Sequence, residues 1–270
     1  MMSESLTRSI SGIVYIALLL GATLLSSISF KILFVVFMFI AVHEYCRLAK
    51  LKTTVPFIIT LTGFVLFGIV TTSAIYENLL LNAAALFVSV GLLVRLFGKS
   101  RIVVSDDNTK IVQLIGYVII PFLLIIKLPF LGADYNPYVI VGMFVMIWAN
   151  DTFAYIVGKS IGKNKLFERI SPKKTIEGFI GGVVFTVAGA YILGLYFTFL
   201  TPLQWMGFAA IVAVFGTLGD LVESQLKRKA GVKDSGNIMP GHGGILDRLD
   251  SVIFAVPFLF LYYQIILYVS

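Results

Sequence analysis

Long apolar runs with almost no charge recur along this 270-residue chain and constrain its fold more than any other feature. A helix needs about 20 mostly apolar residues to cross the hydrocarbon core of a bilayer, and only helices or closed barrels satisfy their backbone groups there. The runs are continuous and lack the alternation of barrel strands. With 59% hydrophobic and 13% charged residues, the chain is far more apolar than a soluble domain, which averages about 25% charged residues. We therefore predict an all-α, polytopic membrane protein.

The apolar runs predict nine spans, divided into an N-terminal transmembrane region, 1–135, and a C-terminal transmembrane region, 136–270, that carries the candidate catalytic residues. A tight turn around Ser29 and Lys31 joins the first two spans. Arg8 ahead of the first run imitates a signal peptide, but no cleavage site is evident, so we expect a retained span. The spans are expected at about 10–30, 32–49, 55–75, 78–97, 111–131, 137–158, 175–199, 203–226 and 249–269.

The basic residues predict the orientation of these spans. With the N-terminus in the cytoplasm, all but two of the 21 basic residues fall in the N-terminal tail and in the loops after every second span, including Lys99 and Arg101. The two exceptions are Lys31 and Lys127. Cytoplasmic loops carry such an excess of Lys and Arg, so the N-terminus is expected inside and the C-terminus outside. The net charge of +7 then suits anionic lipid head groups or a phosphate-bearing substrate, and we expect no nucleic acid partner.

Acidic residues inside spans are costly and therefore mark functional candidates. Asp151 lies within the sixth span. Asp220 and Glu223 share one helix face in the eighth span, and Asp247 and Asp250 repeat that spacing where the ninth begins. Two acidic faces joined by a basic loop predict one shared site.

Such carboxylates need accompanying cations in a region of low dielectric constant. Mg²⁺ prefers oxygen ligands and commonly takes one or two carboxylates, waters and substrate phosphates. Two histidines and the single cysteine, Cys46, support a zinc site poorly. The alternative is that the acids pair with nearby lysines and arginines, an alternative that weighs most for Glu223.

The loop between the last two spans has glycines on both sides of His242. Glycines permit close backbone approach, and the N–H groups of a turn entering a helix can cradle phosphate. Lys227, Arg228 and Lys233 add positive charge suited to a polyphosphate.

A second basic segment precedes the seventh span. Pro172 is expected to end the preceding segment or to open a helix, and Glu177 falls in the first turn of the span. Lys173 and Lys174 either face phosphates or form an ordinary basic flank.

The stretch from Ser224 to Asp250 reads S-x-L-K-R-x4-K-D-x-G-x3-P-x-H-G-G-x2-D-R-x-D and resembles the signature of phosphatidate cytidylyltransferases (CDP-diacylglycerol synthases). Met239 stands where the pattern has Leu, Ile or Phe, a mild change of shape. Two upstream segments, 148–155 and 171–178, resemble the same family. The resemblance implies that CTP and phosphatidate give CDP-diacylglycerol and pyrophosphate, in phospholipid biosynthesis, at a bacterial cytoplasmic membrane with the site facing the cytoplasm.

The resemblance also implies roles for individual residues. Asp220 and Asp247 would bind one or two Mg²⁺ ions, with Asp151, Glu223 and Asp250 as further ligands or close neighbours. The candidate catalytic residues are Asp220, Asp247, Lys227, Arg228 and His242. The candidate substrate-binding residues are Lys173, Lys174, Ser224, Lys233, Asp234, Gly241, Gly243, Gly244 and Arg248.

Other readings of the residues remain open. An ion-coupled transporter would also place acids and glycines in spans, but no internal repeat is evident and the polar residues gather at the cytoplasmic edge. An alcohol phosphotransferase acting on CDP-linked lipids would carry D-G-x2-A-R, which is not present. His43 and Glu44, at the cytoplasmic end of the second span, are expected to be structural or interfacial. A homodimer is one possible assembly.

Overall fold

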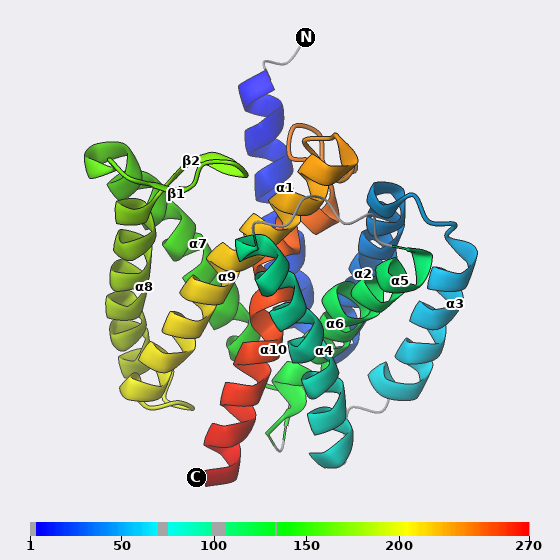
Figure 1. Cartoon of the computed structure of the whole chain (residues 1–270). Helices are drawn as coiled ribbons and strands as arrows, with labels where there is room; N and C mark the ends of the chain where they lie inside the picture. Colours follow the sequence, from blue (N-terminus) through cyan, green and yellow to red (C-terminus); the bar gives the residue numbers. More distant parts are fainter. Residues whose placement is uncertain (1–3, 70–74, 99–105, 133, 270) are drawn as a thin grey trace.

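The computed structural model describes residues 4–69, 75–98, 106–132 and 134–269 and is almost entirely helical. Eight helices in this part of the chain are long and apolar enough to cross a bilayer, and Thr54–Gly68 is a shorter apolar helix. Together they run alternately up and down, so the N- and C-termini lie at opposite ends (Figure 1). This confirms the predicted polytopic helical membrane protein, with a helix count close to nine.

The elements follow one another in a simple order. The end of the predicted span 55–75, and Lys99 and Arg101, lie outside the described residues. The helices are α1 (Glu4–Leu25), α2 (Ser27–Ala49), α3 (Thr54–Gly63), η1 (Phe64–Gly68), α4 (Ile75–Phe97), α5 (Asp107–Leu114), η2 (Ile115–Ile119), α6 (Ile120–Lys127), η3 (Leu128–Phe130), α7 (Pro137–Ile161), α8 (Ile176–Tyr196), α9 (Pro202–Ala230) and α10 (Ile245–Val269), and the strands are β1 (Lys165–Phe167) and β2 (Ser171–Thr175).

The first helical hairpin turns earlier than predicted. Ser26 caps α2, because its side chain accepts a hydrogen bond from the Ser29 backbone N–H at 3.1 Å. The Ser29 hydroxyl in turn donates to the Ala22 carbonyl at 2.7 Å. Lys31 therefore lies inside α2, with its ammonium 4.7 Å from the centre of the Phe130 ring, and the turn predicted at Ser29 and Lys31 is corrected to Ser26.

The predicted span 111–131 is one apolar rod with a local change of winding. α5 passes into the π-helical turn η2 and then into α6, which has Pro121 in its first turn. Proline has no N–H and its ring clashes with the carbonyl four residues earlier, and such irregularities are a known cause of π-turns and bends. The rod nevertheless supplies the most deeply buried apolar segment of the described chain.

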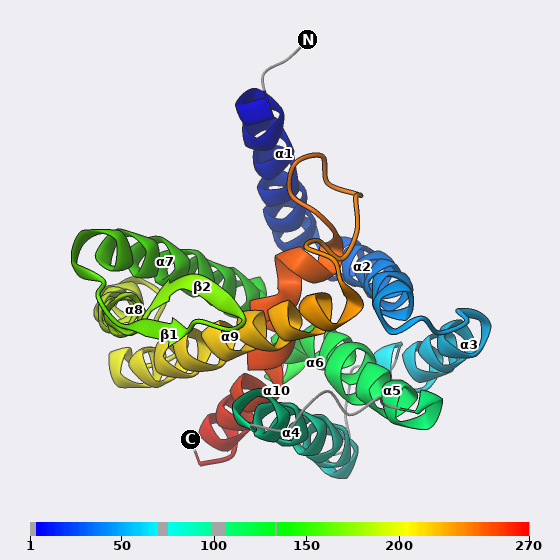
Figure 2. The same cartoon turned by 45° about the horizontal axis from the view of Figure 1, so that its top comes forward.

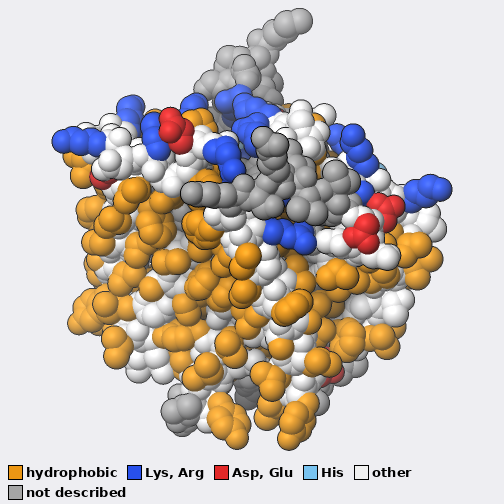
Figure 3. Space-filling view, viewed as in Figure 1, with side chains coloured by type: hydrophobic (Ala, Val, Ile, Leu, Met, Phe, Trp, Pro, Cys, Tyr) orange, Lys and Arg blue, Asp and Glu red, His pale blue; other side chains and the backbone are white. Residues whose placement is uncertain are grey.

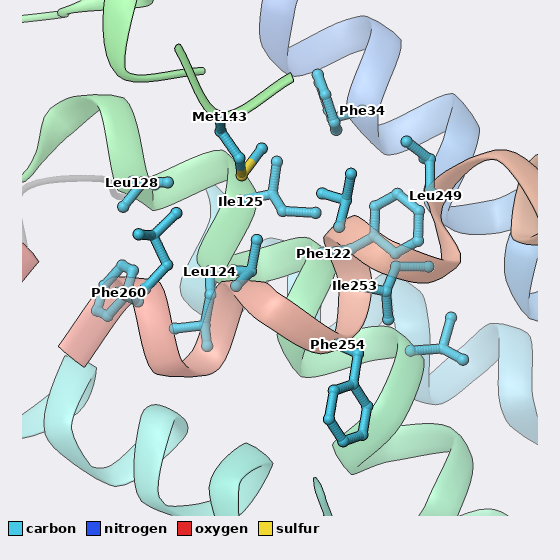
Figure 4. Close-up of a cluster of buried hydrophobic side chains, with 14 of the residues drawn as sticks. Phe34, Phe122, Leu124, Ile125, Leu128, Met143, Leu249, Ile253, Phe254 and Phe260 are labelled. Carbon is cyan, nitrogen blue, oxygen red and sulfur yellow. The ribbon is translucent and has the colours of Figure 1, made fainter. Parts of the chain in front are cut away.

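The core forms where α6 and α10 meet. Figure 4 shows Phe122 of α6 beside Leu249 and Ile253 of α10, and Ile125 of α6 beside Met143 of α7. All five side chains are fully buried. Since α10 contacts α2, α4, α6, α7 and α9, it lies at the centre of the helices, where its first turn can meet residues from both halves of the chain.

The polar parts lie mainly on the face that carries the N-terminus, called here the N-terminal face. Figure 3 shows Lys, Arg, Asp and Glu side chains gathered there above a broad hydrophobic band. An antiparallel hairpin, β1 paired with β2, covers part of this face. Pro172 lies in β2, so the prediction that it ends a segment or opens a helix is corrected. α8 begins at Ile176, where the Thr175 side chain caps it by accepting from the Gly178 N–H at 3.1 Å.

α9 is longer than predicted and reaches beyond the expected end of its span at residue 226. It continues to Ala230 and ends at Gly231, whose φ of 74° is the left-handed conformation that glycine adopts readily. Lys227, Arg228 and Lys229 are therefore helical. Cations in the last turn are favourable near the negative end of the helix dipole, which explains why the helix extends through this basic cluster.

Gly142 of α7 provides a test of the packing between α7 and α9. A Cβ atom at Gly142 would lie 2.5 Å from the ring of Trp205, which is fully buried and donates its Nε1–H to the Phe197 carbonyl at 2.9 Å. Gly142→Ala is expected to lower the free energy of unfolding by about 1–3 kcal/mol, a typical cost of overpacking. Gly189→Ala in α8 is the matched control, because its Cβ would meet no atom within 4 Å. Thermal unfolding in detergent compares them, and equal melting temperatures would contradict the assignment.

Candidate active site

A cavity of about 550 Å³ opens among α7, β2, α8, α9 and α10. Its wall has five basic and five acidic side chains, together with the smaller polar groups of Asn150, Thr217 and Ser251. Nine of the charged residues that line it were predicted as site residues, and Lys159 is the tenth. The charged residues are Asp151, Lys159, Lys173, Lys174, Asp220, Lys227, Asp234, Asp247, Arg248 and Asp250.

Close helix packing brings α7, α8 and α9 around this cavity. A Cβ atom at Gly178 of α8 would lie 2.7 Å from the Ala154 carbonyl of α7, so the two backbones touch. Asn150 of α7 donates its Nδ2–H to the Thr217 hydroxyl of α9 at 3.3 Å. Asp151 follows directly on α7 and reaches the cavity wall.

The β-hairpin carries two predicted lysines to the cavity. The Glu177 carboxylate accepts the backbone N–H of Lys163 at 3.0 Å and of Asn164 at 3.1 Å, which fixes the start of the hairpin. β2 then brings Lys173 and Lys174 to the wall, and the Lys174 ammonium forms an ion pair with Asp220 of α9. The hairpin thus positions cations opposite an acid.

The two acids of α9 point to different surroundings. Asp220 faces the cavity and accepts a hydrogen bond from the Ser224 hydroxyl at 3.2 Å. Glu223 is fully buried outside the cavity lining and pairs with Lys227 one turn later. A separation of three residues is about 300° around a helix, so the two side chains diverge by about 60°. The expectation of one shared acidic face therefore holds only in part.

Lys227 joins α9 to α10. Its ammonium contacts Glu223 and also donates to the Asp247 carboxylate at 2.6 Å. The other Asp247 oxygen accepts from the Ser235 N–H, the Ser235 hydroxyl and the Gly244 N–H, each at 2.8 Å. Both oxygens of Asp247 are thus engaged, and this carboxylate organises the loop 231–244 as well as lining the cavity.

The sequence matches the cytidylyltransferase family over residues 6–266. A protein of Staphylococcus aureus called phosphatidate cytidylyltransferase is 36% identical over 260 residues, which cover 95% of this chain and 96% of that relative. The chain belongs to the cytidylyltransferase family. A Bacillus subtilis protein of the same name is 55% identical over 117 residues, 43% of this chain and 44% of that relative. The predicted resemblance is confirmed, and the chain is a nucleotidyltransferase enzyme.

Part of the family-like segment faces the first helix rather than the cavity. Met239 and Gly243 form an isolated bridge that closes a turn around His242. His242 Nδ1 lies 2.7 Å from the Ser11 hydroxyl of α1, and Figure 2 shows the loop between α9 and α10 beside α1. Burial and the charges of Arg248 and Arg8 lower the pKa of His242, which disfavours its charged form.

Several predicted residues lie outside the cavity lining. Gly241 adopts a φ of 76° and Gly243 a φ of 84°, conformations that glycine tolerates. Arg228 and Lys233 are exposed on the N-terminal face. The predicted residues that the structure does not bring to the cavity wall are Glu223, Ser224, Arg228, Lys233, Gly241, His242, Gly243 and Gly244.

Glu44, which was expected to be structural or interfacial, makes a structural contact with the start of α10. Glu44 of α2 is buried and accepts the backbone N–H groups of Ile245 at 3.1 Å and Leu246 at 2.8 Å. Together with the Gly244 N–H bound by Asp247, the first donors of α10 are therefore occupied by carboxylates of this chain. A phosphate at this predicted cradle would have to displace one of them. The sequence signal for Glu44 was an acidic residue near the end of an apolar span.

The oxygen atoms of the cavity fit a hard divalent cation. Asp220 and Asp250 both line it, with the side-chain oxygens of Thr217 and Ser251 nearby on its wall. In the described part of the chain, no three Asp, Glu, His or Cys side chains already converge as a metal cluster. Mg²⁺ commonly takes only one or two carboxylates and completes its shell with water and substrate phosphates. Asp220 and Asp250 are residues that could hold it, and the predicted ligands Asp151 and Asp247 lie on the same wall.

Proposed function

We propose that this protein transfers a cytidylyl group from CTP to phosphatidate, which forms CDP-diacylglycerol and pyrophosphate in phospholipid biosynthesis. The cavity at the membrane's polar edge carries the proposal, because it combines phosphate-binding cations with carboxylates in a protein otherwise built for lipid. Membership of the cytidylyltransferase family and the names of its relatives support the same reaction. We place the basic N-terminal face in the cytoplasm, where CTP is found, at a bacterial cytoplasmic membrane.

In the proposed reaction, a phosphate oxygen of phosphatidate forms a new bond to the α-phosphorus of CTP. The bond from that phosphorus to the oxygen bridging to the β-phosphate breaks, and pyrophosphate leaves with the electron pair. Both reactants are anions, so charge neutralisation and alignment supply most of the catalysis. Lys173, Lys174 and Arg248 would hold phosphate oxygens, while the ionised phosphatidate needs no strong general base.

The charge balance of the cavity supports dependence on Mg²⁺. Its five basic side chains are matched by five acidic ones, so the protein alone offers little excess positive charge to two polyanionic substrates. Divalent cations on Asp220 and Asp250 would reverse that balance. A bound Mg²⁺ supplies neutralisation of charge on the reacting phosphates. Asp151, Asp247 and Glu223 would then tune the surroundings of these two ligands.

The proposed binding role of Lys174 predicts a kinetic effect. Lys174→Ala is expected to raise the KM for CTP about 10- to 100-fold, the loss that a hydrogen bond to a charged group typically causes. Arg169→Ala is the matched control, because Arg169 is exposed on the same hairpin and outside the cavity lining. Initial rates against CTP concentration measure both variants. An unchanged KM in Lys174→Ala would remove Lys174 from the nucleotide site.

Incorporation of radiolabelled CTP into lipid tests the function itself. Purified protein in mixed micelles receives CTP with phosphatidate, or with diacylglycerol as a lipid control, in the presence of Mg²⁺ or of EDTA. We expect labelled lipid and pyrophosphate in equal amounts only with phosphatidate and Mg²⁺. Product formation in EDTA would contradict the metal requirement. No product under any condition would contradict the reaction and favour the transporter alternative.

A further inference from the structure

Glu44 is a buried carboxylate that comes from the half of the chain opposite to the cavity-lining helices. It lies near the end of α2, whereas its hydrogen-bond donors Ile245 and Leu246 open α10, about 200 residues later. An acid near a helix N-terminus is favourable because it satisfies free N–H groups and the positive end of the dipole. Glu44 therefore caps α10 from another helix.

The same carboxylate reaches the loop that precedes α10. The Ser235 hydroxyl lies 3.2 Å from one Glu44 oxygen and 2.8 Å from Asp247 Oδ2. Ser235 is buried and thus forms a short polar link between the two acids. A displacement of Glu44 would therefore shift the Ser235 hydroxyl that also contacts Asp247.

Two glycines of the loop are explained by the position of Glu44. A Cβ atom at Gly236 or at Gly244 would overlap the Glu44 carboxylate. Neither glycine needs to be there for a positive φ, since only Gly231, Gly241 and Gly243 among the described glycines have one. The Glu44 carboxylate occupies the space that a side chain at either position would need, so both positions require glycine.

We infer that Glu44 is a positioning residue of the active site, which holds the loop 235–246 so that Asp247 and Lys227 face the cavity. The chain of contacts runs from Glu44 to Ser235 and the first turn of α10, then to Asp247, and from Asp247 to Lys227 at 2.6 Å. This inference rests on the proposed function for its kinetic consequences. Its structural consequence, ordering of the loop by Glu44, can be measured without any turnover.

Glu44→Gln is the principal test. Glutamine keeps the size but replaces one acceptor oxygen with an NH₂ group, which faces a backbone N–H or the Ser235 hydroxyl. Misplacement of catalytic groups by about 1 Å can cost about 100-fold in rate, and we expect kcat per folded molecule to fall about 10- to 100-fold. KM for CTP should change less than kcat does, because Lys173 and Lys174 are held by the separate hairpin and only Arg248 of the proposed phosphate-binding residues lies on α10. His43→Ala, an exposed neighbour on α2, is the control and should retain normal kcat.

Hydrogen–deuterium exchange supplies a readout that does not depend on activity. In Glu44→Gln, peptides covering residues 235–247 should exchange at least tenfold faster, while peptides of α7 and α8 should exchange as in the wild type. If the wild type makes no product, the proposed function fails and the exchange result alone decides whether Glu44 orders the loop. Unchanged exchange, or normal kcat per folded molecule in an active enzyme, overturns the inference.

Glu44→Asp covers the case in which the glutamine variant does not fold. It keeps the negative charge but withdraws the carboxylate by one methylene from the Ile245 and Leu246 N–H groups. Relative to the wild type, we expect faster exchange in 235–247 and a lower kcat per folded molecule. Wild-type kcat and exchange in Glu44→Asp would show that the carboxylate's position is unimportant and would overturn the inference.

Discussion

Asp220→Asn is expected to reduce kcat by about 100- to 1,000-fold, the range typical for loss of one group that stabilises transition-state charge. Asp220 lines the cavity opposite Lys174, and its side chain is about one-third exposed (32%), so solvent and a substrate phosphate can reach it. Asparagine keeps the shape of the side chain but removes the charge that would bind Mg²⁺. The assay of labelled CTP incorporation measures the loss at saturating CTP and several Mg²⁺ concentrations.

The folded state of this variant should be nearly as stable as the wild type. Both members of the Lys174–Asp220 pair are partly exposed, and exposed ion pairs contribute about 0–1 kcal/mol. Asp134→Asn is a suitable control, because Asp134 is exposed in the segment that precedes α7 and lies outside the cavity lining. Near-normal kcat in Asp220→Asn, with an unchanged response to Mg²⁺, would remove Asp220 from the metal site.

Asp247→Asn is a less selective test of the same hypothesis. Its carboxylate accepts four hydrogen bonds from Lys227, Ser235 and Gly244, so asparagine would also disturb the loop. A loss of activity in that variant would combine a catalytic and a structural cause. Asp220→Asn is therefore the more selective test of the two predicted metal ligands.

The membrane architecture was predictable because each helix is determined by its own run of apolar residues and not by contacts with distant parts of the chain. Every apolar run of about 20 residues must become a helix in a bilayer, regardless of what it packs against. The same reasoning located the polar segments, and most of the predicted charges do line one cavity. The helix boundaries were less certain, because caps such as Ser26 and Gly231 set them by hydrogen bonds that hydropathy does not record.

The details of the site depend on neighbours that periodicity cannot identify. The Glu223–Lys227 pair is an i, i+4 contact within α9, and the sequence had left it open as an alternative for Glu223. Spacing along α9 does not predict that the same ammonium also reaches Asp247 of α10. His242 turns toward Ser11 of α1 for a similar reason. Glu44 is the clearest case, because its partners begin about 200 residues later in the chain. The short β-hairpin was missed since its basic sequence also suits an unstructured flank.

Lys227→Met is expected to be the most destabilising single change at the site. The Lys227 ammonium is in contact with Glu223, which is fully buried, and with Asp247, whose side chain is only 4% exposed. Methionine has a similar length but leaves both carboxylates buried without their cation. Breaking a buried ion pair by removal of one partner typically costs about 3–5 kcal/mol. Thermal unfolding in detergent measures the change, and Lys229→Met, an exposed neighbour on α9, is the control.

A double variant separates the structural role of Lys227 from its catalytic one. In Lys227→Met/Glu223→Gln, one of the two uncompensated charges is gone, so much of the lost stability should return. Activity should remain as low as in the single variant, because Lys227 also lines the cavity and its charge is still missing there. Recovery of activity together with stability would mean that Lys227 acts only by balancing Glu223. A single variant as stable as the wild type would contradict the buried three-residue network itself.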